Sequence, residues 1–211
     1  MKLDRDFYTT DGLTLAESLI GKVLVHRVNG VELAGVITET EAYMGITDKA
    51  SHAYGGRRTA RTETMYLEGG HAYVYLIYGM YSCMNITAST EGNPEAVLIR
   101  AVYPIAGERE MLDLVRARSR RKSIPDFDGI TESELYSFTN GPGKLCNAMM
   151  IDRDLDALDM TGGDFFVRDD GYRAGEIMKY PRIGIDYAEE AKDYPWRFSV
   201  KLHKRIPTFF K

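Results

Sequence analysis

The sequence has few cysteines, few histidines and no long apolar run. Two cysteines, Cys83 and Cys146, are too few for a disulfide scaffold and fit a reducing compartment. The two cysteines and four scattered histidines lack the spacing of a zinc site, so we expect no metal site. The apolar stretches are short and interrupted by tyrosine, and the N-terminus lacks the apolar segment of a signal peptide. These absences predict no membrane contact and a cytoplasmic protein, or a nuclear one if eukaryotic.

The chain also lacks the basic excess that is typical of nucleic-acid-binding domains, because its net charge is −4. Basic side chains nevertheless cluster locally, at Arg57, Arg58 and Arg61 and again within residues 109–122, while acidic residues dominate the C-terminal third. Solvated surface is the simpler interpretation of both clusters from charge alone. A basic face on an acidic molecule can still bind phosphates.

Length and strand patterns predict the fold class. The 211 residues, 44% of them hydrophobic, suffice for one domain over residues 1–211. Residues 22–28 and 31–43 alternate like strands around Asn29-Gly30, a strong hairpin signal. Residues 73–87, rich in tyrosine and β-branched side chains, predict two strands around Gly79, which form a protruding β-hairpin. Further strands are expected at 96–103, 165–168, 182–185 and 197–201.

Helix signals are fewer. Thr14 and Glu17 have capping-box spacing before a short first helix, and residues 107–121 carry an apolar stripe. A further helix is expected to begin near Asn140 or Gly141, with Pro142 in its first turn. We interpret residues 122–139 as a loop. The predicted class is α+β, a single domain with a curved, mostly antiparallel sheet and flanking helices.

Two carboxylates in the 37–43 run are candidates for chemistry. If this run is a strand, Ile37, Glu39, Glu41 and Tyr43 lie on one face. Carboxylates two positions apart beside an aromatic ring could be a general base with its support. A charged, solvent-facing edge is the simpler interpretation of this run taken alone.

Tyrosines gather in the 73–81 run, at Tyr73, Tyr75, Tyr78 and Tyr81. If the turn centres on Met80, Tyr75 lies opposite Asn85 across the hairpin. An aromatic platform facing an amide suits a nucleobase, because the ring stacks and the amide reads the base edge. The alternative is a tyrosine-rich, half-buried strand.

Three more side chains are candidates. Arg100 follows the apolar residues 97–99, and a cation leaving a buried strand usually has a carboxylate partner, for which Glu41 is the candidate. Lys144 and the glycines at a helix start could bind a phosphate, although a plain helix cap explains the same residues. His52, in a loop of small residues, could equally be a surface histidine.

These signals occur in an order that resembles the alkyladenine (3-methyladenine) DNA glycosylase family from about Leu19 to His203. The resemblance is carried by the segments GKVLVHR, ITETEAYMG, ASHAYGGRRT, YVYLIYGMYSCMNIT, AVLIRAVYP, NGPGKLCNAM, RIGI and WRFSV. It implies an open, barrel-like sheet with flanking helices, and an enzyme that rotates a damaged purine out of duplex DNA and hydrolyses its bond to deoxyribose. Double-stranded DNA with a damaged purine would be the partner of a monomeric enzyme that needs no cofactor.

The resemblance also implies residue roles. Glu41 would activate water, and Arg100 would help to hold Glu41 and that water. The base pocket would consist of Tyr43, His52, Tyr75, Asn85 and Ile183, with Asn85 crowding the exocyclic amino group of guanine. Contacts to DNA would come from Tyr78, the wedge that fills the gap in the duplex, and from Met80, Arg61 and Lys144.

One departure and two alternatives accompany the resemblance. Where the family commonly has Thr-Pro-Arg-Asn, this chain has Thr59-Ala60-Arg61-Thr62 and so lacks a rigid turn residue and an amide. One alternative function is a damage sensor that binds lesions without excising them, against which the presence of both Glu41 and Arg100 argues. The other is an unrelated hydrolase that uses Glu39 and Glu41 on a sugar or nucleoside, in which the Tyr78–Tyr81 segment would have no role.

Overall fold

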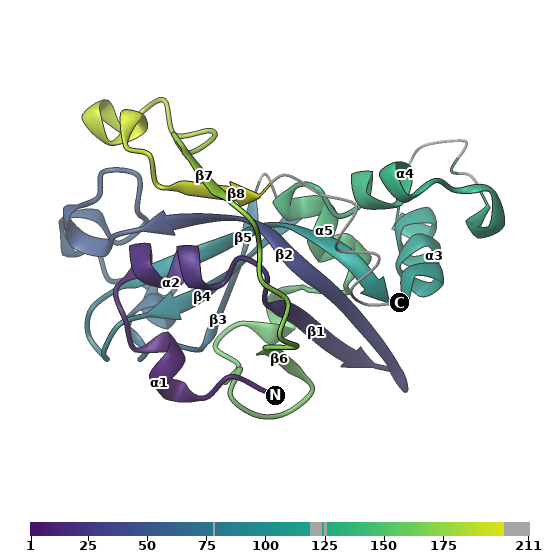
Figure 1. Cartoon of the computed structure of the whole chain (residues 1–211). Coiled ribbons are helices and arrows are strands. Elements are labelled where there is room, and N and C mark those ends of the chain that lie inside the picture. Colours follow the sequence, from purple (N-terminus) through teal and green to yellow (C-terminus); the bar gives the residue numbers. More distant parts are fainter. Residues whose placement is uncertain (78, 119–123, 125, 201–211) are drawn as a thin grey trace.

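A computed structural model describes residues 1–77, 79–118, 124 and 126–200. Their centre is one curved antiparallel sheet with strand order β3-β4-β5-β2-β1-β6, to which β8 adds by pairing with β2 and with β7. Helices flank this sheet, so the expected α+β class with a curled sheet is confirmed (Figure 1).

The strands follow the expected hairpins. Their bounds are β1 Val23–Val28, β2 Val31–Tyr43, β3 Ala72–Ile77, β4 Tyr81–Ala88, β5 Glu95–Ala106, β6 Phe165–Arg168, β7 Ile177–Tyr180 and β8 Arg197–Val200. Asn29 and Gly30 both have positive φ, as the predicted two-residue turn between β1 and β2 requires.

The helices are short. The α-helices are α1 Arg5–Tyr8, α2 Gly12–Ser18, α3 Glu108–Arg118, α4 Glu132–Ser137 and α5 Pro142–Ala148. The 3-10 turns are η1 Gly45–Thr47, η2 Tyr54–Gly56, η3 Glu63–Tyr66, η4 Phe127–Gly129, η5 Arg153–Leu155 and η6 Glu189–Asp193.

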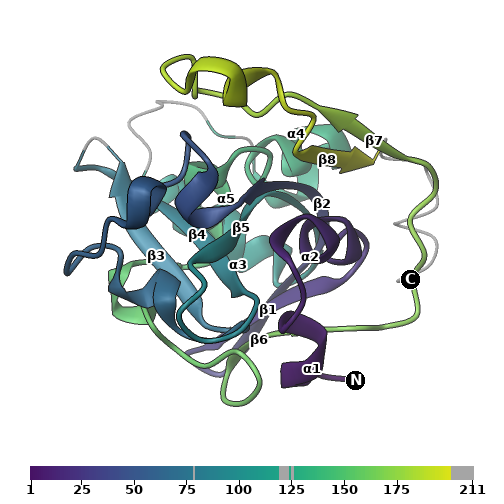
Figure 2. The ribbon, with the colours of Figure 1, turned by 90° about the vertical axis from the view of Figure 1, so that its left-hand side faces the viewer.

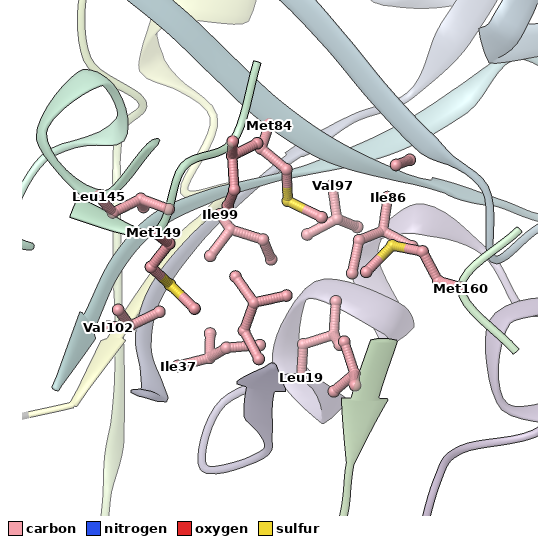
Figure 3. Packing of buried hydrophobic residues seen from close by; sticks show 14 of the residues in the cluster. Leu19, Ile37, Met84, Ile86, Val97, Ile99, Val102, Leu145, Met149 and Met160 are labelled. Carbon is pink, nitrogen blue, oxygen red and sulfur yellow. The ribbon is translucent and has the colours of Figure 1, made fainter. Parts of the chain in front are cut away.

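One large apolar cluster holds the sheet and helices together. Leu15 of α2 and its C-cap Leu19, and Leu145 of α5 and its C-cap Met149, pack with side chains from the sheet. Figure 3 shows part of this cluster, in which Ile37, Met84, Ile86, Val97, Ile99 and Val102 come from β2, β4 and β5. A smaller cluster, which includes Val23, Val25, Val36 and Phe166, packs separately.

Two bulges change which side chains of the β2–β5 pair face the core. Ile37 pairs with Val102, but the next pairs are Glu39 with Ala101 and Thr40 with Ile99, so Thr38 and Arg100 are each an extra residue. Ile37 therefore lies in the core, whereas Glu39 and Glu41 both contact Arg100 on the other side. The expectation that Ile37 shares their face was wrong, because the bulge at Thr38 interrupts the two-residue alternation.

Several other expectations need correction. In the tyrosine-rich hairpin Tyr75 pairs with Cys83, and Asn85 pairs with Tyr73, because the turn centres on Gly79. The N-cap of α2 is Asp11 and not Thr14. The Asp11 side chain accepts hydrogen bonds from the backbone N–H groups of Leu13 and Thr14.

Two segments also differ from expectation. Residues 122–139 contain α4, capped by a Thr131–Glu134 capping box. The strand near 182–185 is instead β7 at Ile177–Tyr180. The expected ends of two elements, residues 119–121 and Lys201, lie outside the described residues.

The C-terminal segment returns to the end of the sheet where β2 finishes. Figure 2 shows residues 45–66 and the segment carrying β7, η6 and β8 at this same end. Ion pairs of Lys49 with Glu189 and Glu190, and apolar contact of Ala50 with Ile185, join the two segments. The candidate site lies between them.

Candidate active site

A cavity of about 480 Å³ opens at this end of the sheet, within the usual size range of ligand pockets. Six elements or segments contribute its wall: β2, the loop 44–65, the β3–β4 hairpin, β5, Pro142 at the start of α5, and the segment 183–187. Eight of the eleven residues expected from the sequence line it, namely Glu41, Tyr43, His52, Arg61, Tyr75, Asn85, Arg100 and Ile183.

Glu41 is fully buried in this wall, and its carboxylate has a partner on each oxygen. Oε1 accepts a hydrogen bond from the backbone N–H of Ile183 at 2.8 Å, and Oε2 accepts one from the Tyr43 hydroxyl at 2.9 Å. Arg100 Nη1 lies 3.2 Å from Oε1, which confirms the predicted ion pair. Burial raises the pKa of Glu41 above its ordinary value, while Arg100, Ile183 N–H and the Tyr43 hydroxyl act in the opposite direction.

Arg100 is shared between two carboxylates. Its Nε donates to Glu39 Oε1 at 3.1 Å, and the same oxygen accepts from Arg197 Nη1 of β8 at 2.8 Å. Because Arg100 is the bulged residue of β5, its side chain leaves the sheet toward the glutamates while Ile99 stays in the core. Glu39, Glu41, Arg100 and Arg197 thus form an alternating row of charges with no net charge.

The opposite part of the wall is aromatic. The His52 ring meets the Tyr75 ring edge-on at 4.7 Å between centroids, and Tyr73 lies 5.2 Å from Tyr75. His52 Nδ1 is 2.9 Å from the Tyr73 hydroxyl. Burial, together with Arg61 and Arg57, lowers the pKa of His52 to about 4, so this imidazole is neutral at pH 7. Burial raises the pKa values of Tyr43 and Tyr75, which stay protonated.

Asn85 and Arg61 complete this wall. Asn85 is buried and donates from Nδ2 to the backbone carbonyl of Tyr73 at 3.1 Å. Although the hairpin register differs from expectation, it differs by an even number of residues, so Asn85 still faces the cavity. Arg61 places its guanidinium 5.2 Å over the Tyr75 ring.

Two of the remaining three expected residues, Met80 and Lys144, are not among the described residues that line the cavity. Met80 follows Gly79 in the β3–β4 turn with 65% of its surface exposed. Lys144, in α5, donates to the Ser137 carbonyl at 3.1 Å. Tyr78 lies outside the described residues.

Sequence reasoning missed three features around the site. Arg182 and Asp48, both with fully buried side chains, form a two-pronged ion pair, and the Arg182 guanidinium lies 4.8 Å from the Tyr43 ring. The sequence places Arg197 only within a predicted strand, and it carries no signal for Tyr187, which lines the cavity and is 69% exposed. An arginine in a short apolar run was the one available signal for Arg182 and Arg197, and it does not identify the partner.

Among the residues that the structure describes, no group of three or more histidine, cysteine or acidic side chains could hold a metal ion. Over the same residues, none of the helices has the length and apolar character needed to cross a membrane.

The amino-acid sequence that builds this buried, ion-paired carboxylate beside an aromatic cavity matches known proteins. Residues 6–204 match the family model for methylpurine-DNA glycosylase. The chain belongs to this family. It is therefore a DNA glycosylase, a hydrolase of base excision repair, and DNA is its partner. The alternative of an unrelated sugar or nucleoside hydrolase is set aside by this match.

Bacterial relatives agree with the assignment over the full length. A protein of Clostridium acetobutylicum is 49% identical over 211 residues, which is 100% of both chains. One of Desulfitobacterium hafniense is 47% identical over 200 residues, covering 95% of each chain. A Clostridium botulinum protein is 48% identical over 202 residues, or 95% of this glycosylase and 96% of the relative. All three are provisionally named as 3-methyladenine DNA glycosylases.

Proposed function

We propose that this glycosylase rotates alkylated or deaminated purines of the 3-methyladenine, hypoxanthine and ethenoadenine type out of duplex DNA. Water activated by Glu41 then hydrolyses the N-glycosidic bond and leaves an intact abasic site. The observation that carries this proposal is Glu41 itself, a fully buried carboxylate in the wall of an aromatic cavity, beside Arg100.

For a cationic base the chemistry needs little more than this carboxylate, whereas a neutral base such as hypoxanthine or ethenoadenine must also gain a proton as it leaves. A 3-methyladenine base is already cationic and leaves as a neutral molecule, so its bond to the sugar requires only a water molecule placed behind C1′. Glu41 accepts the proton of that water, and its negative charge stabilises the oxocarbenium-like sugar. Burial raises the pKa of Glu41, which makes the carboxylate a better proton acceptor. Arg100 and Ile183 N–H hold the carboxylate in place.

The aromatic wall suits a purine base. Tyr43, His52 and Tyr75 offer rings to an extruded base, and Ile183 offers an apolar contact. A neutral His52 does not repel a cationic base, and a cation over a tyrosine face gains roughly 0.5–2 kcal/mol. Asn85 crowds the position that the 2-amino group of a guanine would occupy.

Residues around the cavity mouth would hold the DNA. Tyr78 and Met80 connect β3 to β4, and we assign Tyr78 the wedge role and Met80 a contact beside it. Arg61 and Lys144 contact DNA, Arg61 at the cavity and Lys144 in the first turns of α5. The enzyme acts as a monomer.

The proposed enzyme has no strand-cleaving lyase activity. Lyase chemistry requires an amine that forms a Schiff base with the sugar. The described residues that line the cavity include no lysine, and the Lys144 amine is bound to the Ser137 carbonyl.

Glu41→Gln is the variant that tests the proposal. Glutamine keeps the size of the side chain but cannot accept a proton from water, and losing a general base costs about 10²–10⁴ in rate. We expect almost no release of hypoxanthine from a lesion duplex under single-turnover conditions, with DNA binding retained. Glu32→Gln is the matched control, because Glu32 lies on the same strand but pairs with Arg27 and Arg168 at its opposite end.

The same assay separates the alternatives. Base release by Glu41→Gln at the wild-type rate would refute the role of Glu41. A damage sensor would bind the lesion duplex in both forms and release base in neither. Trapping of a covalent protein–DNA adduct by borohydride would contradict the intact abasic product.

A further inference from the structure

The row of four charges beside the cavity ends at a residue that lies outside the cavity wall. Arg197 of β8 contacts Glu39, Glu39 contacts Arg100, and Arg100 contacts Glu41. The three inner side chains are at most 14% exposed, so their interactions are only weakly screened by water. Arg197 is fixed from a second direction, since its Nε donates to the Pro181 carbonyl at 2.9 Å and its guanidinium lies 4.9 Å from the Tyr180 ring.

We propose that Arg197 is a positioning residue that neutralises Glu39 and thereby keeps the Arg100 guanidinium available to Glu41. The inference rests on the proposed role of Glu41 as the general base. It gives the β7–β8 pair a part in catalysis, although no residue of β8 lines the cavity among those described.

Arg100 is one cation between two anions, Glu39 and Glu41. With Arg197 present, Glu39 has two guanidinium partners and Arg100 can serve Glu41. Without Arg197, two carboxylates share Arg100 alone, so the negative charge of Glu39 acts on Glu41 with less compensation. A like charge nearby raises the pKa of a carboxyl group. The removal of Arg197 therefore raises the pKa of Glu41, and the removal of Glu39 lowers it.

Outside the row of four charges, the groups that face Glu41 do not titrate in the assay range. Tyr43 on β2 and Tyr75 on β3 have raised pKa values because they are buried. Burial raises the pKa of Cys83 on β4 to about 11. From the C-terminal segment Glu41 receives the N–H of Ile183, which has no charge. His52 has a pKa of about 4, so above pH 5 the acidic limb of the rate profile reports mainly Glu41.

The test is the pH dependence of the single-turnover rate on a hypoxanthine duplex. Hydrolysis needs ionised Glu41, so the rate rises with pH as Glu41 loses its proton, and a higher pKa moves this limb to higher pH. We expect Arg197→Gln to shift the acidic limb to higher pH. At a pH on this limb the variant should react roughly tenfold more slowly than the wild type, and its rate should recover at higher pH.

Two variants separate charge from mere support of the strand pair. Lys179→Gln removes another cation of the same strand pair, which anchors β7 to Glu17 of α2 and does not touch the charge row. It should leave the position of the limb unchanged. Arg197→Lys keeps the positive charge but loses the planar guanidinium that contacts both Glu39 and the Pro181 carbonyl. It should retain most of the wild-type pH profile.

A double variant decides the question. Glu39→Gln alone should move the limb to lower pH, because Arg100 then serves Glu41 only. Glu39→Gln combined with Arg197→Gln should return the limb near the wild-type position, whereas a structural role predicts that the double variant is worse than either single one. If the acidic limb stays at its wild-type pH in all three variants, the inference is overturned. This holds even if Arg197→Gln folds poorly, because the limb of Glu39→Gln is measured on a separate protein. Failure of the proposed function is recognised separately, by base release from Glu41→Gln.

Discussion

Asn85 is the residue on which base selectivity is expected to depend. It is 3% exposed, held by its hydrogen bond to the Tyr73 carbonyl, and faces the cavity from β4. Asn85→Ala should increase the removal of guanine-type bases relative to hypoxanthine, because relief of a clash typically changes discrimination by about 1–3 kcal/mol. The measurement is the ratio of single-turnover rates on 7-methylguanine and hypoxanthine duplexes. Thr87→Ser, two residues along the same strand, is the control, and an unchanged ratio for Asn85→Ala would remove this role.

Single residues of the site were predictable where side-chain chemistry dictates a partner. Arg100 after an apolar run required a carboxylate, and Glu41 is that carboxylate. The contribution of Ile183 was not predictable in this form, because it donates its backbone N–H, a group that every residue except proline has. The neutral state of His52 also depends on burial and on Arg61 and Arg57, which the sequence alone does not place.

At the scale of elements, the segment that carries Ile183 is held by one buried ion pair. Arg182 binds both oxygens of Asp48 and also donates to the carbonyls of Ala42 and Ala191. Asp48→Asn leaves a buried guanidinium without its counter-charge, which typically costs about 3–5 kcal/mol. We expect a lower urea midpoint with an unchanged m-value, and weaker catalysis because Ile183 loses its fixed position.

Glu63→Gln provides the contrast for this prediction. Glu63 pairs with Arg58, and both side chains are 55% exposed, so the loss of this pair should leave the urea midpoint unchanged. Equal midpoints for Asp48→Asn and the wild type would show that the segment is held mainly by the apolar contacts of Ala50, Ile185 and Ala188.

The elements themselves were predictable to different degrees. The β1–β2 hairpin was predicted correctly because a local Asn-Gly turn fixes it. The predicted register of the β3–β4 hairpin was displaced because it placed the turn at Met80, whereas Gly79, which has positive φ, lies at the centre of the turn. The bulges at Thr38 and Arg100 have no local signal, since they depend on how β2 and β5, which are far apart in the sequence, pair with each other. These bulges turn Glu39, Glu41 and Arg100 away from the core, so the site depends on the part of the fold that was hardest to predict.

At the scale of the whole molecule, charge is distributed unevenly between two basic clusters. In the described part of residues 109–122, Arg109 pairs with Asp128, and Arg116 pairs with Asp113 and Asp126, so acidic neighbours partly neutralise this cluster. In the cluster of Arg57, Arg58 and Arg61, Arg58 pairs with Glu63, but Arg61 lines the cavity wall. We therefore expect Arg57, Arg58 and Arg61, and not the cluster within residues 109–122, to contribute most to DNA binding.

The salt dependence of DNA affinity tests this distribution. Each phosphate neutralised by an arginine contributes about −0.9 to the slope of log K against log salt, whatever the net charge of the protein. Affinity should fall steeply with salt despite the net charge of −4, and Arg57→Gln should make the slope less steep by about one phosphate. Arg27→Gln is the control, because Arg27 lies at the far end of the β1–β2 hairpin and pairs with Glu32. A flat salt response in the wild type would show that the arginines beside the cavity are ordinary solvated surface. A slope changed as much by Arg27→Gln as by Arg57→Gln would show that DNA does not approach the protein from the cavity side.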